Sequence, residues 1–134
     1  RVISEWPDLS RRTIGDQLIR SVDSISSNIA EGYGRIGTGE RLQFLFYADA
    51  SNQEAKNHLR LAFARELIVE EVHAHYRKRL RALSISTIEF CAYLLAIDTV
   101  YDGRFRKAVD RRRAWLVAKK SQSPSQEQDS SEHP

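Results

Sequence analysis

Residues 24–35 read Ser-Ile-Ser-Ser-Asn-Ile-Ala-Glu-Gly-Tyr-Gly-Arg, and the helix that this stretch ends decides the fold. The helix is marked by apolar residues three or four positions apart, namely Ile14, Leu18, Val22, Ile25 and Ile29. That spacing is typical of an amphipathic helix with one buried face. We expect it to begin at Ser10 or Thr13 and to end between Gly32 and Gly34, where glycine favours a left-handed terminal conformation.

Two longer helical patterns follow these glycines. The first covers residues 38–65, with Thr38 as a suitable N-cap, and carries a stripe of small residues. The second covers residues 69–98 with apolar residues at nearly heptad spacing. If residues 1–9 are the tail of a preceding helix, the sequence predicts an all-α, up-down four-helix bundle over residues 1–102.

The positive charge of the chain is concentrated in one short segment. The 134 residues include 21 Lys or Arg and 18 Asp or Glu, a net charge of +3. Residues 1–102 are nearly neutral, whereas residues 103–120 hold eight basic residues and one acid. This basic extension also contains Phe105 and Trp115, which is compatible with a short amphipathic helix. We expect residues 121–134, which contain no aliphatic residue, to form a disordered tail.

The basic residues suggest binding of a polyanion, with a solvated helical surface as the alternative. Binding through them should weaken steeply with salt, because phosphate contacts release counterions. The candidate nucleic-acid-binding residues lie on the predicted helices, the glycine loop and the basic extension. They are Arg20, Arg35, Arg41, Lys56, Arg60, Arg104, Arg106, Lys107, Arg111, Arg112, Arg113, Lys119 and Lys120.

Four polar residues stand beside the apolar stripes of the first two complete helices. They are Asn28, Glu31, Ser51 and Glu54. Buried polar groups need hydrogen-bond partners, so these residues form either a buried site or a network that fixes helix register. We favour the structural network.

Patterns for catalysis and metal binding are incomplete. Glu70, Glu71, His73 and His75 lack a second carboxylate–histidine pair, and the lone Cys91 has no cationic neighbour in its apolar seam. The glycines of residues 32–39 follow a helix, not a strand, and no Lys-Ser/Thr pair accompanies them. We therefore expect a non-enzymatic protein with no cofactor and no metal.

The sequence also suggests a location for the protein. We expect a cytoplasmic, bacterial-type protein, because we find no apolar run long enough for a bilayer and no signal peptide. The chain opens on Arg1 without a methionine, so we expect the native N-terminus to be missing.

Residues 24–32 carry the pattern Ser-Ile-x-x-Asn-Ile-Ala-Glu-Gly. A second segment matches through Phe46, Ala48, Ser51 and Glu54, with Ala50 in place of the usual glycine. In both segments the chain resembles the bacterial four helix bundle protein family, first noted within intervening sequences of large-subunit ribosomal RNA genes. The accessory protein of diversity-generating retroelements is related to this family.

The resemblance implies a four-helix bundle that assembles into a ring-shaped homo-oligomer, with a pentamer favoured. It also implies binding of RNA or DNA without catalysis, beside a reverse transcriptase. The near-neutral residues 1–102 depart from the strongly basic surface of such rings. A protein–protein adaptor, for example an accessory subunit to a reverse transcriptase, is the alternative function, because residues 85–97 are apolar on several sides.

Overall fold

The structure is a computed structural model that describes residues 2–127, with side chains described through residue 119. The described elements are all helical. They are η1 (Ile3–Glu5), α1 (Asp8–Ser10), the π-helical turn η2 (Arg11–Gly15), α2 (Asp16–Gly34), α3 (Thr38–Ala64), α4 (Glu70–Ile97) and α5 (Phe105–Glu127).

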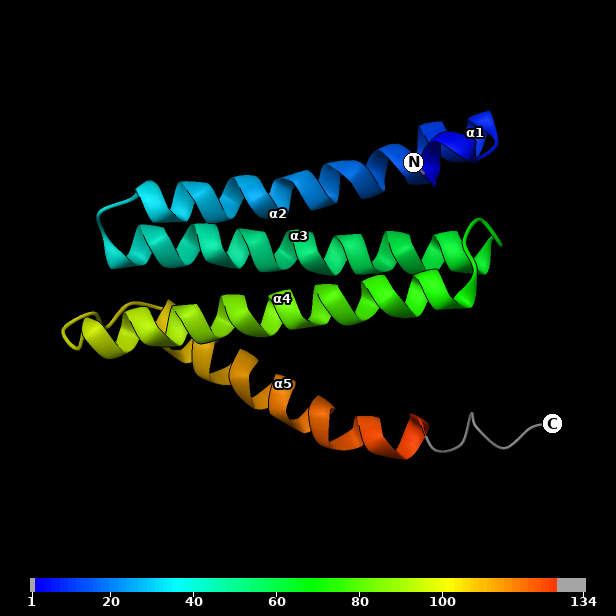
Figure 1. The fold of residues 1–134 in the computed structure, drawn as a ribbon. Helices are drawn as coiled ribbons and strands as arrows, with labels where there is room; N and C mark the ends of the chain where they lie inside the picture. The colour runs from blue at the N-terminus through cyan, green and yellow to red at the C-terminus, as the bar shows by residue number, and fades with distance from the viewer. Residues whose placement is uncertain (1, 128–134) are drawn as a thin grey trace.

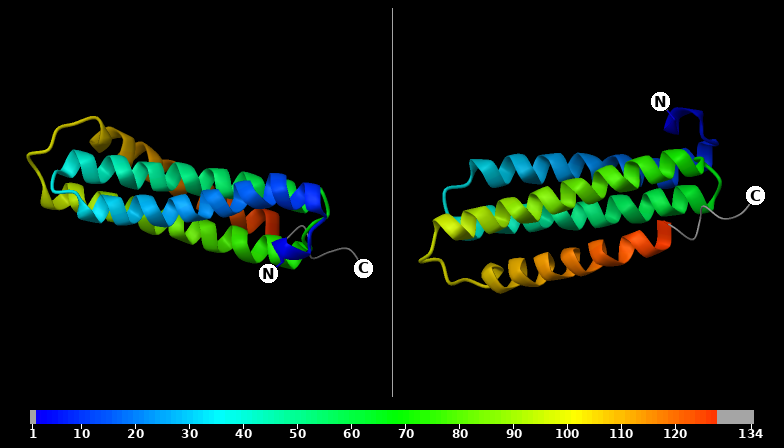
Figure 2. Two further views of the ribbon diagram at one scale, coloured as in Figure 1. Left: turned by 90° about the horizontal axis from the view of Figure 1, so that it is seen from above. Right: turned by 60° about the horizontal axis from the view of Figure 1, so that its bottom comes forward.

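The four long helices run up and down and pack in chain order (Figure 1). Helix α3 packs against α2 and α4, and α5 packs against α4 and, less extensively, against α3. Helices α2 and α5 lie on opposite sides of the α3–α4 pair and do not meet within the described residues (Figure 2). The all-α prediction is confirmed, and the helices form a sequential array. The ring-shaped assembly stays a prediction.

The fourth helix of the array is α5, whereas the sequence suggested a helix before residue 9. Residues 2–7 instead contain only the short 3-10 helix η1 at one end of the molecule, where Trp6 is buried in a cluster with Ile14, Leu59, Ala62 and Ile68. Helix α5 brings Val109 and Leu116 into the larger cluster formed by α3 and α4.

The helix that begins the array starts earlier than predicted. Elements α1, η2 and α2 are continuous, so the helical chain begins at Asp8, directly after Pro7. Asp8 in the first turn favours the helix dipole and pairs with Arg11 at 2.7 Å and with Arg12. Thr13 does not cap a helix start, because its hydroxyl donates to the carbonyl oxygen of Leu9 at 2.8 Å.

Gly32 serves close packing and not a left-handed helix end. Helix α2 continues through Gly34, and no glycine in the described residues has a positive φ. A Cβ atom on Gly32 would lie 3.3 Å from the carbonyl oxygen of Arg41 and 3.5 Å from Cγ of Leu45. The absent side chain therefore lets α2 approach α3.

The left-handed helix end occurs after α3, at Glu66 with φ 60°. The N–H of Glu66 donates to Phe63 O at 3.0 Å, and the N–H of Leu67 donates to Ala62 O at 2.9 Å. These two bonds form a Schellman motif that satisfies the last carbonyl groups of α3. A non-glycine residue occupies the position where glycine is favoured.

Thr38 links two helices and does not cap α3, whose N-cap is Gly37. Its hydroxyl donates to Oδ2 of Asp98 at 2.5 Å, which ties the start of α3 to the end of α4. This hydrogen bond is the main reason that the pKa of Asp98 is lowered. The backbone N–H of Tyr101 donates to the other carboxylate oxygen at 3.1 Å.

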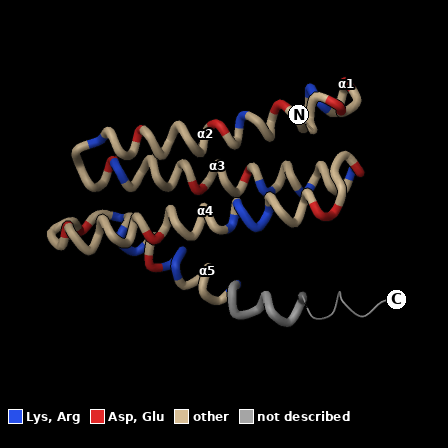
Figure 3. The backbone as a smooth tube through the Cα atoms, in the orientation of Figure 1, with Lys and Arg blue, Asp and Glu red and all other residues tan. Residues whose placement is uncertain are grey.

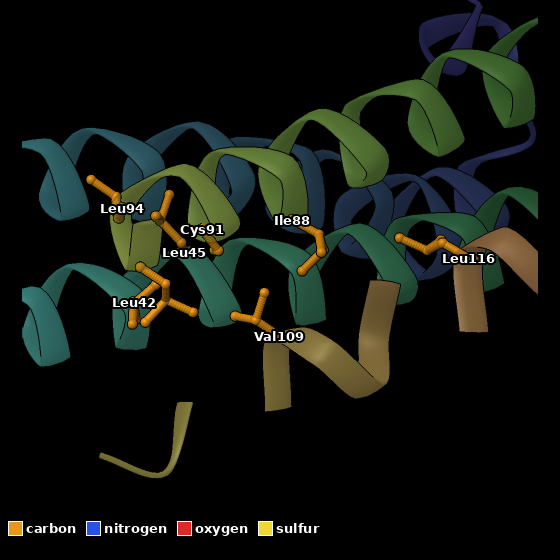
Figure 4. Close-up of a cluster of buried hydrophobic side chains, with 8 residues drawn as sticks. Leu42, Leu45, Ile88, Cys91, Leu94, Val109 and Leu116 are labelled. Carbon is orange, nitrogen blue, oxygen red and sulfur yellow. The ribbon is translucent and has the colours of Figure 1, made fainter. Parts of the chain in front are cut away.

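Helix α4 is long and apolar enough, by length and composition alone, to cross a membrane. The expectation that no such run exists was therefore wrong. The helix nevertheless supplies core residues: Ile88 and Cys91 are fully buried against Leu42 of α3 and Val109 of α5 (Figure 4). Its outward face leaves Tyr93 and Ile97 exposed. We therefore describe α4 as the core helix of this array, with one uncovered apolar side.

The basic extension forms the first part of α5, which continues to Glu127. Residues 121–127 are thus helical, whereas the sequence predicted disorder from residue 121. Each added helical residue gains a backbone hydrogen bond without needing a buried side chain, so polar residues can prolong an existing helix. The rest of the predicted tail, residues 128–134, lies outside the described residues.

Candidate nucleic-acid interface

Helix α5 is held to the array by a narrow apolar seam. Val109 and Leu116 are buried, and both belong to the cluster shown in Figure 4. The ring of Phe105 stacks on Phe46 of α3 at a centroid distance of 5.3 Å. These contacts occupy one side of α5, whereas charged residues such as Lys107 and Arg111 are exposed on its other sides.

A buried ion pair fixes the rotation of α5. Nε of Arg112 donates to Oδ2 of Asp49 at 2.9 Å, and Ser84 of α4 donates to Oδ1 of Asp49 at 2.5 Å. Arg112 also donates to the Ser84 hydroxyl at 3.2 Å. The side chains of Asp49 and Arg112 are only 8% and 18% exposed, so this network joins α3, α4 and α5 in a largely dry environment.

Sequence reasoning missed the role of Asp49, although a signal was present. The residue stands next to Ala48 and three positions before Asn52, inside the buried small-residue stripe of α3. A carboxylate at such a position needs a partner. Its partner Arg112 lies 63 residues away, so the chain spacing gave no indication of which cation it would be.

Two more of the predicted phosphate contacts are used within the protein. Arg106 donates to Tyr101 O at 2.8 Å and to Asp98 O at 2.9 Å, which closes the loop between α4 and α5. Arg113 makes two hydrogen bonds to the carboxylate of Glu89 at 3.0 and 3.3 Å, and both side chains are about half exposed. Arg106 therefore has a structural role, as does Arg112.

The exposed cations of α5 form the rest of the basic extension. They are Arg104, which directly precedes the helix, and Lys107, Arg111 and Lys119 within it. Figure 3 shows the Lys and Arg positions along α5 and in the middle of α4. The side chain of Lys120 lies outside the described residues. We define the four exposed cations as the α5 basic surface.

The other predicted phosphate contacts are not gathered on this surface. Arg35 pairs with Glu31 at 3.1 Å and lies over the ring of Phe44, and Arg41 donates to the carbonyl oxygen of Arg35 at 2.5 Å. These two arginines meet at the loop between α2 and α3. Arg20 is exposed on α2, and Arg60 on α3 donates to Asn57 at 2.9 Å.

Lys56 of α3 lies half buried where α3, α4 and α5 meet. The pKa of Lys56 is lowered to about 8, mainly by burial and in addition by the positive charges of Arg112, Lys119 and Arg81, against the opposing effect of Asp49. Trp115 stands beside this group, with the Arg112 guanidinium and the Lys119 ammonium 4.6 and 4.7 Å from its ring centroid. Three helices thus bring cations and an aromatic ring together.

The predicted polar network exists in part. The hydroxyls of Ser24 and Ser51 are 2.9 Å apart, and Nδ2 of Asn28 donates to the Ser24 hydroxyl at 3.1 Å. This network joins α2 to α3. Glu31 and Glu54 are exposed and do not belong to it, because both carboxylates lie on the outer sides of their helices.

Two of the residues considered for metal binding or nucleophilic chemistry, His73 and Cys91, pack against their neighbours. His73 stacks on Phe63 at 4.7 Å, and burial is the main reason that its pKa is lowered. Burial raises the pKa of the Cys91 thiol to about 12, with a further contribution from Asp49, which suppresses the reactive thiolate. No cluster of three or more His, Cys, Asp or Glu residues able to hold a metal occurs in the described part of the chain.

Comparisons with known proteins bear on the helices before α5. Residues 1–87, which include α2, α3 and the first part of α4, match the profile of a family described as 23S rRNA-intervening sequence protein. A search of curated proteins gave no significant match. A search of solved structures gave none either. The match covers well over half of the chain, and the chain therefore belongs to the 23S rRNA-intervening sequence protein family.

Proposed function

We propose that this protein is a non-enzymatic helical protein that binds RNA or DNA through the α5 basic surface. One observation carries the proposal: the largest concentration of positive charge lies on a helix whose buried side is fixed by Val109, Leu116 and Arg112. Fixed, exposed cations attract phosphate groups and hold them in register. Arg35 and Arg41 supply a separate, smaller positive site at the α2–α3 loop.

The test uses point substitutions, because deleting α5 would uncover the core. We define the surface variant as Arg104→Gln, Lys107→Gln and Arg111→Gln, and the control variant as the exposed set Arg12→Gln, Arg65→Gln and Arg77→Gln. Both variants lose three positive charges. Fluorescence anisotropy with a labelled structured RNA should show at least tenfold weaker binding for the surface variant at about 50 mM salt.

The control variant should bind much as the wild type does, because its substitutions lie outside α5. Two results would overturn the proposal. One is the absence of binding by the wild-type protein at low salt. The other is an equal loss of affinity in both variants, which would reduce the effect to overall net charge.

A second candidate function, a protein–protein adaptor, is favoured by an uncovered apolar surface. A groove of about 310 Å³ lies between α2 and α4 and is lined mainly by Val22, Ile25, Ile29, Leu80 and Leu83. We propose a second copy of this chain as its occupant, which accords with the predicted homo-oligomer, a pentamer in the favoured form. A reverse transcriptase is the alternative partner for this groove. We also propose that the protein is located in the cytoplasm.

Light scattering tests self-association directly. Val22→Glu with Leu83→Glu places two acids in the groove at positions that are already partly exposed. We expect the wild type to be oligomeric and this variant to be monomeric with its helical content unchanged. A wild-type monomer at micromolar concentration would contradict self-association, and co-purification with a reverse transcriptase without nucleic acid would favour the adaptor.

A further inference from the structure

Four cations from three helices converge at the junction of α3, α4 and α5. Lys56 comes from α3, Arg81 from α4, and Arg112 and Lys119 from α5. The three other cations are close enough to Lys56 to lower the pKa of its ammonium group. Within the part of the chain that the structure describes, the carboxylate that acts on Lys56 is Asp49, which is already bonded to Arg112 and Ser84. Three cations and one carboxylate of the described residues therefore act on the Lys56 ammonium.

An aromatic ring stands beside these cations. Trp115 is 47% exposed, although the neighbouring Leu116 is buried. The ring is flanked by Arg112, which Asp49 and Ser84 hold in place, and by Lys119, whose side chain is exposed. A large aromatic side chain exposed among cations is a favourable platform for a flat, electron-rich or anionic ligand.

We propose that this junction, made of Lys56, Arg81, Arg112, Trp115 and Lys119, binds one nucleotide of a single-stranded nucleic acid. Its phosphate lies between Lys56 and Lys119, and its base stacks on Trp115 in place of the Lys119 ammonium. The inference rests on the proposed function and adds to it a preference for unpaired strands. The α5 basic surface then follows the neighbouring phosphates.

The preference for a single strand comes from the ring. In a duplex the bases are stacked on one another and cannot cover a protein aromatic side chain, whereas unpaired bases can. Cations alone would bind a duplex or any other polyanion equally well. A phosphate near Lys56 also offsets the repulsion by Arg81, Arg112 and Lys119, which makes the charged form of Lys56 more favourable.

This electrostatic arrangement gives a pH dependence. Lys56 is faced by Asp49 from its own helix, by Arg81 from α4, and by Arg112 and Lys119 from α5, and its pKa is about 8. A bound phosphate raises the pKa of Lys56. Above pH 8, where the free Lys56 side chain is mostly neutral, binding is therefore accompanied by uptake of a proton by Lys56. Affinity should fall by about tenfold between pH 7 and pH 9. The Lys56→Arg variant should lose this dependence, because arginine stays charged.

The experiment measures the anisotropy of a labelled 12-nucleotide oligouridine and of a duplex of the same length. We expect the wild type to bind the single strand more tightly, and Trp115→Ala to weaken that binding about tenfold while Trp115→Phe retains most of it. Lys56→Gln should weaken single-strand binding at pH 7, and it does so without altering the aromatic ring. Thermal melting of each variant checks that it is folded.

The outcomes separate this inference from the function on which it rests. If the surface variant loses affinity but Trp115→Ala and Lys56→Gln do not, the junction is not a nucleotide site and the proposed function stands. Equal binding of duplex and single strand, or of polyphosphate and oligouridine, would overturn the nucleotide inference. If the wild type binds no nucleic acid, both proposals fail.

Discussion

At the residue scale, the Asp49–Arg112 pair determines whether α5 presents its charges in a fixed position. The two side chains are mostly buried, and Ser84 completes the hydrogen bonds of the carboxylate. Removing one member of a buried pair leaves the other without compensation, which costs far more than the pair contributes on balance. The pair is therefore a positioning device whose loss affects both stability and the α5 basic surface.

We predict that Asp49→Ala lowers the free energy of unfolding by about 3 kcal/mol. The matched control is Glu89→Ala, which removes the exposed partner of Arg113 and should cost at most about 1 kcal/mol. Urea denaturation followed by circular dichroism measures both. The double variant Asp49→Ala with Arg112→Leu should recover part of the loss, and a loss no larger than that of Glu89→Ala would contradict the assigned role.

The lowered pKa of Lys56 should make the stability of the protein depend on pH. Its folded-state pKa of about 8 lies below the usual lysine value of 10.5, so its charge is unfavourable below pH 8 and this cost disappears as the pH rises to 10.5. Lys56→Met should therefore stabilise the protein by about 1 kcal/mol at pH 7, allowing for solvent screening, and the electrostatic part of that gain should vanish near pH 10.5. Thermal melting at both pH values, with the exposed Lys107→Met as control, tests this.

The sequence predicted which segment carries the candidate site. It did not predict which of the cations in that segment are exposed and which bond to groups within the protein. The basic extension was visible as a run of cations, and Lys107 and Arg111 are exposed as a phosphate contact requires. Arg106 and Arg112 belong to the same run but bond to groups within the protein. Their partners lie on other elements, so their burial depends on tertiary packing that local spacing does not contain.

At the element scale, helix existence followed from the apolar spacing, whereas helix ends did not. The spans of α3 and α4 agree with the predicted residues 38–65 and 69–98 within a residue or so. The prediction that α2 ends in a left-handed glycine was wrong. Glycine has two uses in helices, as a left-handed cap and as a point of close approach to another helix. Gly32 has the second use, which only the position of α3 reveals.

Alanine substitutions at two glycines near the end of α2 should change the stability of the protein in opposite directions. Gly32→Ala should destabilise the protein by about 1–2 kcal/mol, because the new Cβ would press on the Arg41 carbonyl oxygen at 3.3 Å and on Leu45. Gly34→Ala should stabilise it by about 0.5–1 kcal/mol, because its Cβ meets nothing within 4 Å and alanine favours the helix. Chemical denaturation of both variants gives the comparison. Equal effects of the same sign would contradict the close approach of α2 and α3.

At the scale of the whole molecule, the all-α class was predictable but the source of the fourth helix was not. The sequence suggested that residues 1–9 continue a preceding helix, and it placed the basic extension outside the bundle. Helix α5 instead covers Leu42 and Ile88 through Val109. Its few apolar residues are separated by charges, so the sequence alone could not show that they reach the core. The family match, which ends at residue 87, does not include α5.

The most direct test of nucleic-acid binding through α5 is the salt dependence of that binding. The measurement is the slope of log Kd against log salt for the wild type and for the surface variant with the same single-stranded RNA. Each lost phosphate contact should lower the slope by about one, so the three substitutions should lower it by about two to three. Unchanged slopes in the surface variant would show that Arg104, Lys107 and Arg111 do not contact phosphate and would contradict the account.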